Sequence, residues 1–327
     1  MTQNLIPAPA NSLASIQELQ ELALDYASKS KSDNTKNAYA SDWADFESWA
    51  TLHNVPTRPA RPETVALYIT HLAKSGSKTS TIQRRLVAIS QAHKGSGYES
   101  PTAAQIVRAT MSGIRRTIGT ATEGKAPILT EHVKTWVSGL GDDLVSMRDK
   151  ALVLVGFAGA FRRSELVGLN YSDLEFTPQG VIVTLRKSKT DQEGKGRRVG
   201  IPYGKITNGT PSPTCPVTAL LAWLETAHIE SGPVFRRLRR GGIVTPDRLE
   251  SKSVSLIVKG LCQTVGLEPD LYGAHSLRAG HITQAAKNGA GERETMRQSG
   301  HKSLEVFRGY VRDAEIFQQN SAVALDL

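Results

Sequence analysis

A segment without hydrophobic periodicity divides this chain into two regions. Residues 119–127 read Gly-Thr-Ala-Thr-Glu-Gly-Lys-Ala-Pro, a small and polar composition that is typical of linkers. The chain has 327 residues, which is long enough for two domains of ordinary size. The sequence therefore predicts a first domain at 12–118, a linker at 119–127 and a second domain at 128–327, after a flexible tail at 1–11.

The first region has apolar residues at helical spacing throughout. In one segment Tyr39, Trp43, Phe46 and Trp49 share a face, and the other segments repeat this spacing of three and four residues. Proline and glycine residues separate the segments, as they do at helix boundaries. We predict a compact all-helical domain, with helices over residues 12–26, 39–50, 62–75, 80–94 and 101–114.

The second region mixes helices with two short strands. A helix predicted over 144–156 is apolar on every side from Ala151 onward, so it should be buried. Residues 181–185 are mostly β-branched, and residues 197–202 are placed to pair with them across a polar turn. Further helices are predicted over 131–140, 216–227, 251–265, 275–288, 292–299, 303–310 and 313–327. The predicted fold class is mainly α with a small antiparallel β-sheet.

Composition limits the classes of function. The net charge is +9 and the pI is near 9.5, which suits a polyanionic partner such as nucleic acid. Cys215 and Cys262 are too few for a disulfide framework or a cysteine metal site, so two buried thiols are predicted. No stretch approaches the ~20 apolar residues that cross a bilayer, and the N-terminus does not resemble a signal peptide. We expect a cytoplasmic protein that does not act at a membrane.

Cationic and aromatic residues near the C-terminus have the composition of a phosphodiester-cleaving site. His275 and Arg278 stand as His-x-x-Arg at a predicted helix start, followed by Gly300-His301 and by Tyr310. Arginine forks bind the charge that a phosphodiester gains under attack. A tyrosine hydroxyl, with a free pKa near ~10, is a poor nucleophile unless a base and cations surround it. Each residue taken alone is weak evidence, so the interpretation depends on the whole set.

A second cationic group lies upstream of this set. Arg162 follows the predicted buried helix, and Glu165 lies three residues further on, within helical reach of it. We interpret Arg162 as an arginine that Glu165 holds in place to bind phosphate. The alternative interpretation of this pair is a surface ion pair, which contributes little stability. The neighbouring Arg163 is the other candidate for the phosphate-binding arginine, and the Arg-x-x-Glu spacing favours Arg162. Lys189 is the candidate lysine of the polar turn, which also contains Lys187 and Lys195.

In chain order, the pattern Arg–Lys–His-x-x-Arg–His–Tyr resembles the tyrosine recombinase (phage integrase) family, and within it Cre-like and Xer-type enzymes. The resemblance extends over nearly the whole chain. It implies a two-domain clamp on DNA, with a helical SAM-like core-binding domain and a tyrosine recombinase catalytic domain. His301 follows the common family pattern, whereas Cre-like enzymes can have tryptophan there.

The resemblance also implies roles for the six residues. Tyr310 would attack a scissile phosphate and form a 3′-phosphotyrosine, while His275 assists proton transfer. Arg162, Arg278 and His301 would hold the non-bridging oxygens, with Glu165 supporting Arg162, and Lys189 would protonate the leaving 5′ oxygen. This chemistry needs no ATP, metal or other cofactor, and no carboxylate cluster in the sequence suggests Mg²⁺.

DNA-binding residues are expected in both regions. Helix termini with polar residues suit groove entry. The candidates of the first region, for which solvated helix faces are the alternative, are Asn34, Thr35, Lys36, Asn37, Lys78, Thr79, Gln83 and Arg84. Four arginines within five residues repel one another unless phosphate is near, and this cluster consists of Arg236, Arg237, Arg239 and Arg240.

The expected partners are double-stranded DNA with a specific inverted-repeat site and further copies of the chain. The resemblance implies a homotetramer on two DNA sites, joined by exchange of the C-terminal helix. The apolar residues after Tyr310 leave two options open, docking on a neighbouring subunit or folding back onto their own domain. A type IB topoisomerase is an alternative function, and a catalytically silent site-specific DNA-binding regulator is another.

Overall fold

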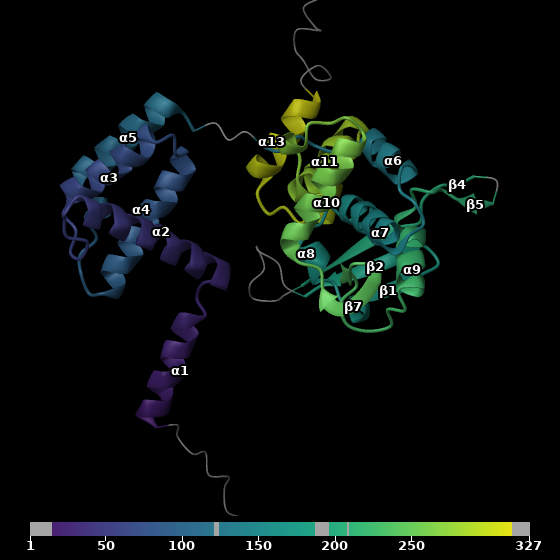
Figure 1. Ribbon diagram of the computed structural model, residues 1–327, viewed down its shortest axis with the longest axis horizontal. Helices are drawn as coiled ribbons and strands as arrows, with labels where there is room; N and C mark the ends of the chain where they lie inside the picture. The colour runs from purple at the N-terminus through teal and green to yellow at the C-terminus, as the bar shows by residue number, and fades with distance from the viewer. Residues whose placement is uncertain (1–14, 121–123, 187–195, 208, 316–327) are drawn as a thin grey trace, which may run out of the picture. The chain divides into compact units, whose positions relative to one another are not determined.

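The computed structural model describes residues 15–120, 124–186, 196–207 and 209–315 of the chain. The chain forms two compact units, Met1–Glu123 and Gly124–Leu327. Both units are visible in Figure 1. Among the helices of the described residues, none is long and apolar enough to span a membrane.

The first unit is entirely helical in its described part. Its core consists of aromatic and aliphatic side chains that the four later helices contribute, among them Phe46, Tyr68, Ile69, Ile82 and Ile89, all with no exposed surface. A single 3-10 turn at Pro101–Ala103 replaces the predicted start of the last helix, which begins at Gln105 instead. The helices are α1 (Ile16–Ser28), α2 (Asp33–Leu52), α3 (Pro62–Lys74), α4 (Thr79–Gly95) and α5 (Gln105–Ile118).

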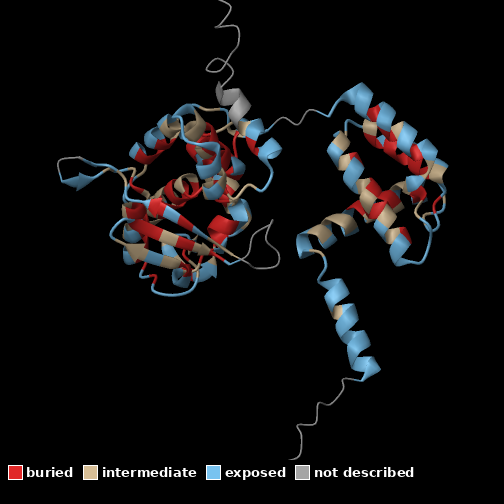
Figure 2. Cartoon of the chain, turned by 180° about the vertical axis from the view of Figure 1, so that it is seen from behind, coloured by how far each residue is buried: buried red, intermediate tan, exposed pale blue. Residues whose placement is uncertain are grey.

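Helix α1 differs from the other helices of this unit because it buries no residue. Its apolar side chains have the predicted helical spacing, yet Leu19, Leu22 and Tyr26 are all exposed, and Figure 2 shows this helix in pale blue along almost its whole length. A capping box between Ser15 and Glu18 satisfies the orphan amides of its first turn. Capping, rather than packing, accounts for its N-terminal boundary.

The second unit packs helices around α7 and carries a small sheet along one edge (Figure 1). The sheet is antiparallel in the order β1-β2-β3. The pairing of β2 with β3 was predicted from the sequence, and in the observed register Val181 lies opposite Ile201. The strands are β1 (Leu174–Thr177), β2 (Gly180–Leu185), β3 (Arg197–Pro202), β4 (Ile206–Thr207), β5 (Thr210–Pro211), β6 (Arg236–Arg239) and β7 (Ile243–Arg248). The helices are α6 (Thr130–Ser138), α7 (Leu144–Ala158), α8 (Arg163–Gly168), α9 (Pro216–Thr226), α10 (Ser251–Thr264), α11 (Ala274–Lys287), α12 (Glu292–Ser299) and α13 (Leu304–Glu315). The predicted fold class is therefore confirmed.

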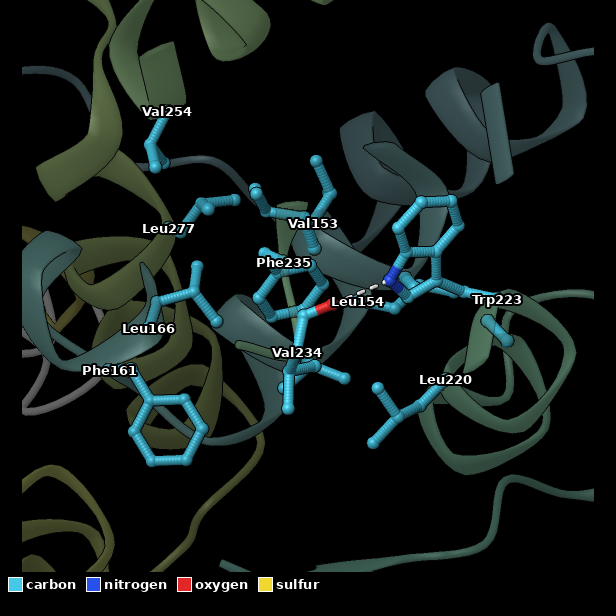
Figure 3. Packing of buried hydrophobic residues seen from close by; sticks show 14 of the residues in the cluster. Val153, Leu154, Phe161, Leu166, Leu220, Trp223, Val234, Phe235, Val254 and Leu277 are labelled. Carbon is cyan, nitrogen blue, oxygen red and sulfur yellow. Dashed lines mark hydrogen bonds between the residues drawn. The ribbon is translucent and has the colours of Figure 1, made fainter. Parts of the chain in front are cut away.

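The all-apolar stretch of α7 forms the centre of the core in this unit. Its residues from Ala151 to Gly156 are buried, as their pattern predicted. Figure 3 shows Val153 and Leu154 of this helix among side chains of the neighbouring elements. The indole of Trp223 donates to the carbonyl of Val234 over 2.9 Å, so the polar atom of this buried ring is satisfied. Burying one such Leu or Val side chain stabilises a fold by about 1.5–3 kcal/mol.

The predictions for the second unit are incomplete or wrong at four places. The sequence did not predict β1 or the short helix α8, and it treated the arginine cluster at 236–240 as a charged segment, whereas its first residues form strand β6. The helix of Tyr310 was predicted to end there, with a new helix from residue 313, but α13 continues to Glu315. Residues 311–315 contain no glycine or proline that would end a helix. The rest of the predicted tail helix, 316–327, lies outside the described residues.

Candidate active site

Helices α11 and α13 bring the predicted nucleophile and base into contact. His275 lies in the first turn of α11, and its Nε2 is 2.7 Å from the hydroxyl oxygen of Tyr310 on α13. The two helices are held together by the buried pair Ile282 and Phe307. The hydroxyl of Thr283 also donates to the backbone carbonyl of Tyr310 over 3.4 Å. The tyrosine is therefore presented to the histidine of its own chain.

Arg278 lies one turn further along α11, and it is buried with only 1% of its surface exposed. Its Nη1 donates to the carbonyl of Ala160 over 2.7 Å and also to the carbonyl of Ser299. Its Nη2 lies 3.2 Å from the imidazole nitrogens of His301. Burial lowers the pKa of Arg278 to about 10, and the charge of Arg162 acts in the same direction. The side chain still carries its proton at neutral pH.

His301 follows the end of α12, where Gly300 takes the left-handed conformation with φ of 70°. The Nδ1 of His301 lies 2.9 Å from the hydroxyl of Ser299. Burial lowers the pKa of His301 to about 4, and the charge of Arg278 is the next largest cause. His301 is therefore neutral at pH 7 in the DNA-free protein.

Arg162 enters the site from the turn after α7 and forms the N-cap of α8. Its Nη1 donates to Glu165 Oε1 over 2.6 Å, and its backbone amide donates to Oε2 over 2.9 Å. The Glu165 side chain is 1% exposed, so this is a buried pair rather than a surface ion pair. The adjacent Arg163 is exposed. Of the two arginines that the sequence left open, Arg162 is the one whose charge acts on Arg278 and His301.

Arg197, at the start of β3, also belongs to this cluster, and the sequence reasoning missed it. Its Nη1 donates to the carbonyl of Gln298 over 2.7 Å, and its Nη2 lies 3.5 Å from Glu165 Oε2. The strand pattern could have indicated this position. Val199 and Ile201 point inward and are buried, and residue 197 lies on the same face of the strand. An arginine in an inward-facing register position is unusual. Lys189 and its alternatives Lys187 and Lys195 lie outside the described residues.

Charge is unevenly distributed in this cluster. Arg162, Arg197 and Arg278 are cationic, and Glu165 is the carboxylate that faces them among the described contacts. Such an excess of fixed positive charge in a partly buried place favours an anion such as a phosphodiester. No three His, Cys, Asp or Glu side chains converge on a metal-sized position within the described part of the chain.

The candidate DNA-binding residues of the first unit lie at two helix starts, and some of them have partners within the unit. Asn34, Thr35, Lys36 and Asn37 lie within the first five residues of α2, where Lys36 pairs with Asp33 at 3.3 Å. At the start of α4, Lys78 is the N-cap residue and Thr79 the first helical residue.

Further along α4, the two remaining candidates make hydrogen bonds within the first unit. Gln83 accepts a hydrogen bond of 2.6 Å from Arg115. The fork of Arg84 donates to both oxygens of the buried Asp42, over 2.7 and 2.9 Å. This pairing gives Arg84 a structural partner that the sequence did not indicate.

The arginine cluster of the second unit lies on the hairpin of β6 and β7. Arg236 differs from the others because it donates to the carbonyls of Pro233 and Ser231. Arg237, Arg239 and Arg240 are exposed. The hairpin therefore presents three solvent-facing guanidinium groups and uses the fourth to fix its own base.

Comparison with known proteins matches both units to one family. Residues 128–315 match the phage integrase family, and residues 21–95 match the phage integrase N-terminal SAM-like domain. An integrase/recombinase xerD homolog of Selenomonas ruminantium is 44% identical over 297 residues, which cover 90% of this chain and 85% of that protein. The Cre recombinase of Escherichia phage P1 is 22% identical, with 87% of this chain and 85% of Cre covered.

Solved structures share the fold. The XerH site-specific recombinase, bound to its palindromic difH substrate after cleavage, has a TM-score of 0.65 at 15% identity, covering 97% of this chain and 86% of XerH. A lambda integrase dimer on a core site has a TM-score of 0.57 at 17% identity, covering 90% of this chain and 94% of that one. Because the family match covers most of the chain and the xerD homolog is so similar, this chain belongs to the phage integrase family, the site-specific tyrosine recombinases that act on DNA.

Proposed function

We propose that this chain cuts and rejoins DNA at a specific site through a covalent 3′-phosphotyrosine intermediate at Tyr310. The observation that carries this proposal is the 2.7 Å contact between the Tyr310 hydroxyl and His275 Nε2, beside a cluster of guanidinium groups. A phenol is a weak nucleophile at neutral pH, and a hydrogen-bonded base is the feature that activates it.

The proposed cleavage step uses the six residues in their predicted roles. The hydroxyl oxygen of Tyr310 attacks the scissile phosphorus as His275 takes its proton. The new Tyr–O–P bond forms while the P–O5′ bond breaks, and the leaving 5′ oxygen takes a proton from Lys189. The tyrosine ester retains the energy of the phosphodiester, so attack by a 5′ hydroxyl rejoins the strand without ATP.

Two cationic groups and one imidazole stabilise the charge that develops on the non-bridging oxygens. Arg162 and Arg278 supply guanidinium forks, and His301 supplies an imidazole. Glu165 holds the guanidinium of Arg162 at 2.6 Å, which fixes its orientation before DNA binds. Prior fixation matters because a transition state is best stabilised by groups that need not reorganise.

Tyr310→Phe tests this proposal. The variant should form no covalent protein–DNA adduct, because the attacking oxygen is absent, and it should still bind the target site. Adducts are detected on denaturing gels with labelled duplex DNA, and sequencing of DNA recovered with the variant identifies the site. An adduct that persists in Tyr310→Phe refutes the assignment of the nucleophile.

We also propose that the protein acts in the cytoplasm as a homotetramer on two inverted-repeat sites. The two units would clamp the duplex, with domains at 12–118 and 128–327 joined by the linker at 119–127. XerH was solved on a palindromic substrate and lambda integrase as a dimer on its core site, and both support a symmetric DNA target. The apolar residues after Tyr310 would dock on the neighbouring subunit.

A further inference from the structure

Arg197 has an incompletely satisfied guanidinium within the cluster. Its Nε and Nη2 are fully buried, and neither atom has a hydrogen-bond partner among the described residues. An unpaired buried donor costs free energy, so such groups in native proteins call for an explanation. Burial also lowers the pKa of this arginine.

The contacts that Arg197 does make connect three parts of the site. Nη1 donates to the carbonyl of Gln298 over 2.7 Å, two residues before Gly300. Nη2 lies 3.5 Å from the same Glu165 carboxylate that binds Arg162. The backbone of Arg197 pairs with Leu185 at the base of the β2–β3 hairpin, whose connection contains Lys189.

The last turn of α12, which contains Gln298, and the following Gly300 lie against this guanidinium. The side-chain amide of Gln298 (Nε2) donates to the carbonyls of Gly200 on β3 and Ala158 at the end of α7, over 3.0 and 3.1 Å. A Cβ atom on Gly300 would lie 2.9 Å from Cζ of Arg197, so the guanidinium lies directly against the glycine backbone. His301 is the next residue.

We propose that Arg197 is a positioning residue for the cleavage step: its guanidinium fixes the Glu165–Arg162 pair and the turn that carries His301 relative to the β2–β3 hairpin. This inference rests on the proposed function, because it concerns the same site. In this proposal Arg197 acts through these residues rather than by contacting the scissile phosphate. Its Nη2 lies on the Oε2 side of Glu165, so its charge holds that carboxylate without competing for the 2.6 Å bond of Arg162 to Oε1.

The test separates positioning from DNA contact and from general stability. The probe is a labelled duplex of the site recovered with Tyr310→Phe, nicked beside the scissile phosphate so that the released fragment traps the adduct. Wild type, Arg197→Ala, Arg197→Gln and Arg197→Lys are compared for single-turnover adduct formation, DNA affinity at several salt concentrations and thermal unfolding. Arg198→Ala is the matched control, since this neighbour is exposed and pairs with Glu175 on the sheet surface.

We expect Arg197→Ala and Arg197→Gln to form the adduct roughly 10- to 100-fold more slowly, as is usual when a residue that orients a reacting group is lost. Their DNA affinity should stay within about threefold of wild type, because no phosphate contact is lost. Arg197→Lys should recover part of the rate, since it keeps the charge and one donor to Gln298. Arg198→Ala should behave as wild type.

Three results would overturn the inference. One is adduct formation at the wild-type rate in Arg197→Ala. Another is a loss of affinity equal to the loss of rate, with a shallower salt dependence, which would make Arg197 a DNA contact. The third is equal inactivity of all three variants together with unfolding at the assay temperature. A different result would refute the proposed function itself: wild type and Arg198→Ala are both folded, but wild type forms no adduct. The inference about Arg197 would then fail as well.

Discussion

Arg278 keeps its positive charge in a place where burial makes charge costly. Two backbone carbonyls, those of Ala160 and Ser299, accept its hydrogen bonds and offset part of that cost. Its pKa nevertheless falls to about 10, with burial as the main cause. Arg278 is therefore a buried cation whose charge a bound phosphate would neutralise. This is the electrostatic arrangement expected of an anion-binding site.

His301 should make the stability of the second unit depend on pH. Its pKa is about 4 in the folded protein, against 6.5 for the free side chain, so between these values the unfolded chain binds more protons than the folded one. The free energy of unfolding should therefore fall as pH falls from about 6.5 towards 4. His301→Gln should reduce this fall, although burial also lowers the pKa of His281, which remains in the variant.

Differential scanning calorimetry at pH 7 and pH 5 measures this effect. The difference in unfolding temperature between wild type and His301→Gln at pH 7, where the His301 imidazole is neutral, serves as the baseline. An equal loss of unfolding temperature on acidification in wild type and His301→Gln would contradict the expected titration.

Helix α11 positions more of the site than any other described element, and its own position depends on an extended segment at the start of the second unit. The amide of Ala126 donates to Leu271 and that of Ile128 donates to Ser276, over 2.8 and 3.1 Å. This segment crosses the helix at Gly280, where a Cβ atom would lie 1.8 Å from the carbonyl oxygen of Ile128. Glycine is required here for close approach of two backbones.

Gly280→Ala should destabilise the second unit. The added methyl must displace backbone rather than a flexible side chain, and overpacking of this kind costs about 1–3 kcal/mol. Gly260→Ala on α10 is the matched control, because that glycine is exposed and an added Cβ atom would meet nothing within 4 Å. The control should gain about 0.5–1 kcal/mol from reduced backbone entropy. Denaturant unfolding that ranks the two variants in the opposite order would contradict this account.

Elements with a continuous apolar run or β-branched residues were predictable from the sequence, and very short or highly charged elements were not. Helix α7 was recognisable because Ala151 to Gly156 are apolar without interruption, and the β2–β3 pair because of its β-branched residues. Helix α8 has six residues, too few for a helical period to appear. The β6–β7 ribbon was missed because its first strand reads Arg-Arg-Leu-Arg, a charge pattern that hides strand alternation.

The β6–β7 hairpin should contribute to DNA affinity through charge. Replacing Arg237, Arg239 and Arg240 together by alanine should flatten the dependence of log affinity on log salt, by about 0.9 for each phosphate contact that is lost. Arg236→Ala is the control, because its guanidinium is used within the protein by the carbonyls of Pro233 and Ser231. Fluorescence anisotropy at several salt concentrations gives both slopes. An unchanged slope in the triple variant would exclude this hairpin from the DNA interface.

The site of the second unit joins segments that are far apart in the chain. Residue types in chain order were sufficient to predict Arg162, His275, Arg278, His301 and Tyr310 as candidates. What the sequence did not reveal are the contacts that orient them, such as the carbonyl of Ala160 on Arg278, because any residue type supplies a carbonyl. Arg197 escaped notice for a related reason, since its proposed role depends on its inward position beside Glu165 and not on a motif.

The residues after α13 offer a way to separate cleavage from assembly. A chain truncated after Glu315 keeps Tyr310 and His275, whose contact lies within one protomer, so it should still form the covalent adduct on a nicked duplex. Loss of the apolar side chains at 316–327 should weaken the pairing of two DNA sites, because a tetramer needs contacts between protomers. Native gels with duplexes of two lengths measure that pairing.

Point variants refine the truncation. Phe317→Ser removes one large apolar group and should weaken pairing, whereas the neighbouring Gln318→Ser exchanges one polar side chain for another and should not. A truncated protein that pairs two sites as well as the full chain would mean that this segment folds back onto its own subunit. The opposite result, loss of adduct formation together with pairing, would mean that cleavage itself requires the neighbouring subunit, and the intramolecular Tyr310–His275 contact would then describe a resting state of the enzyme.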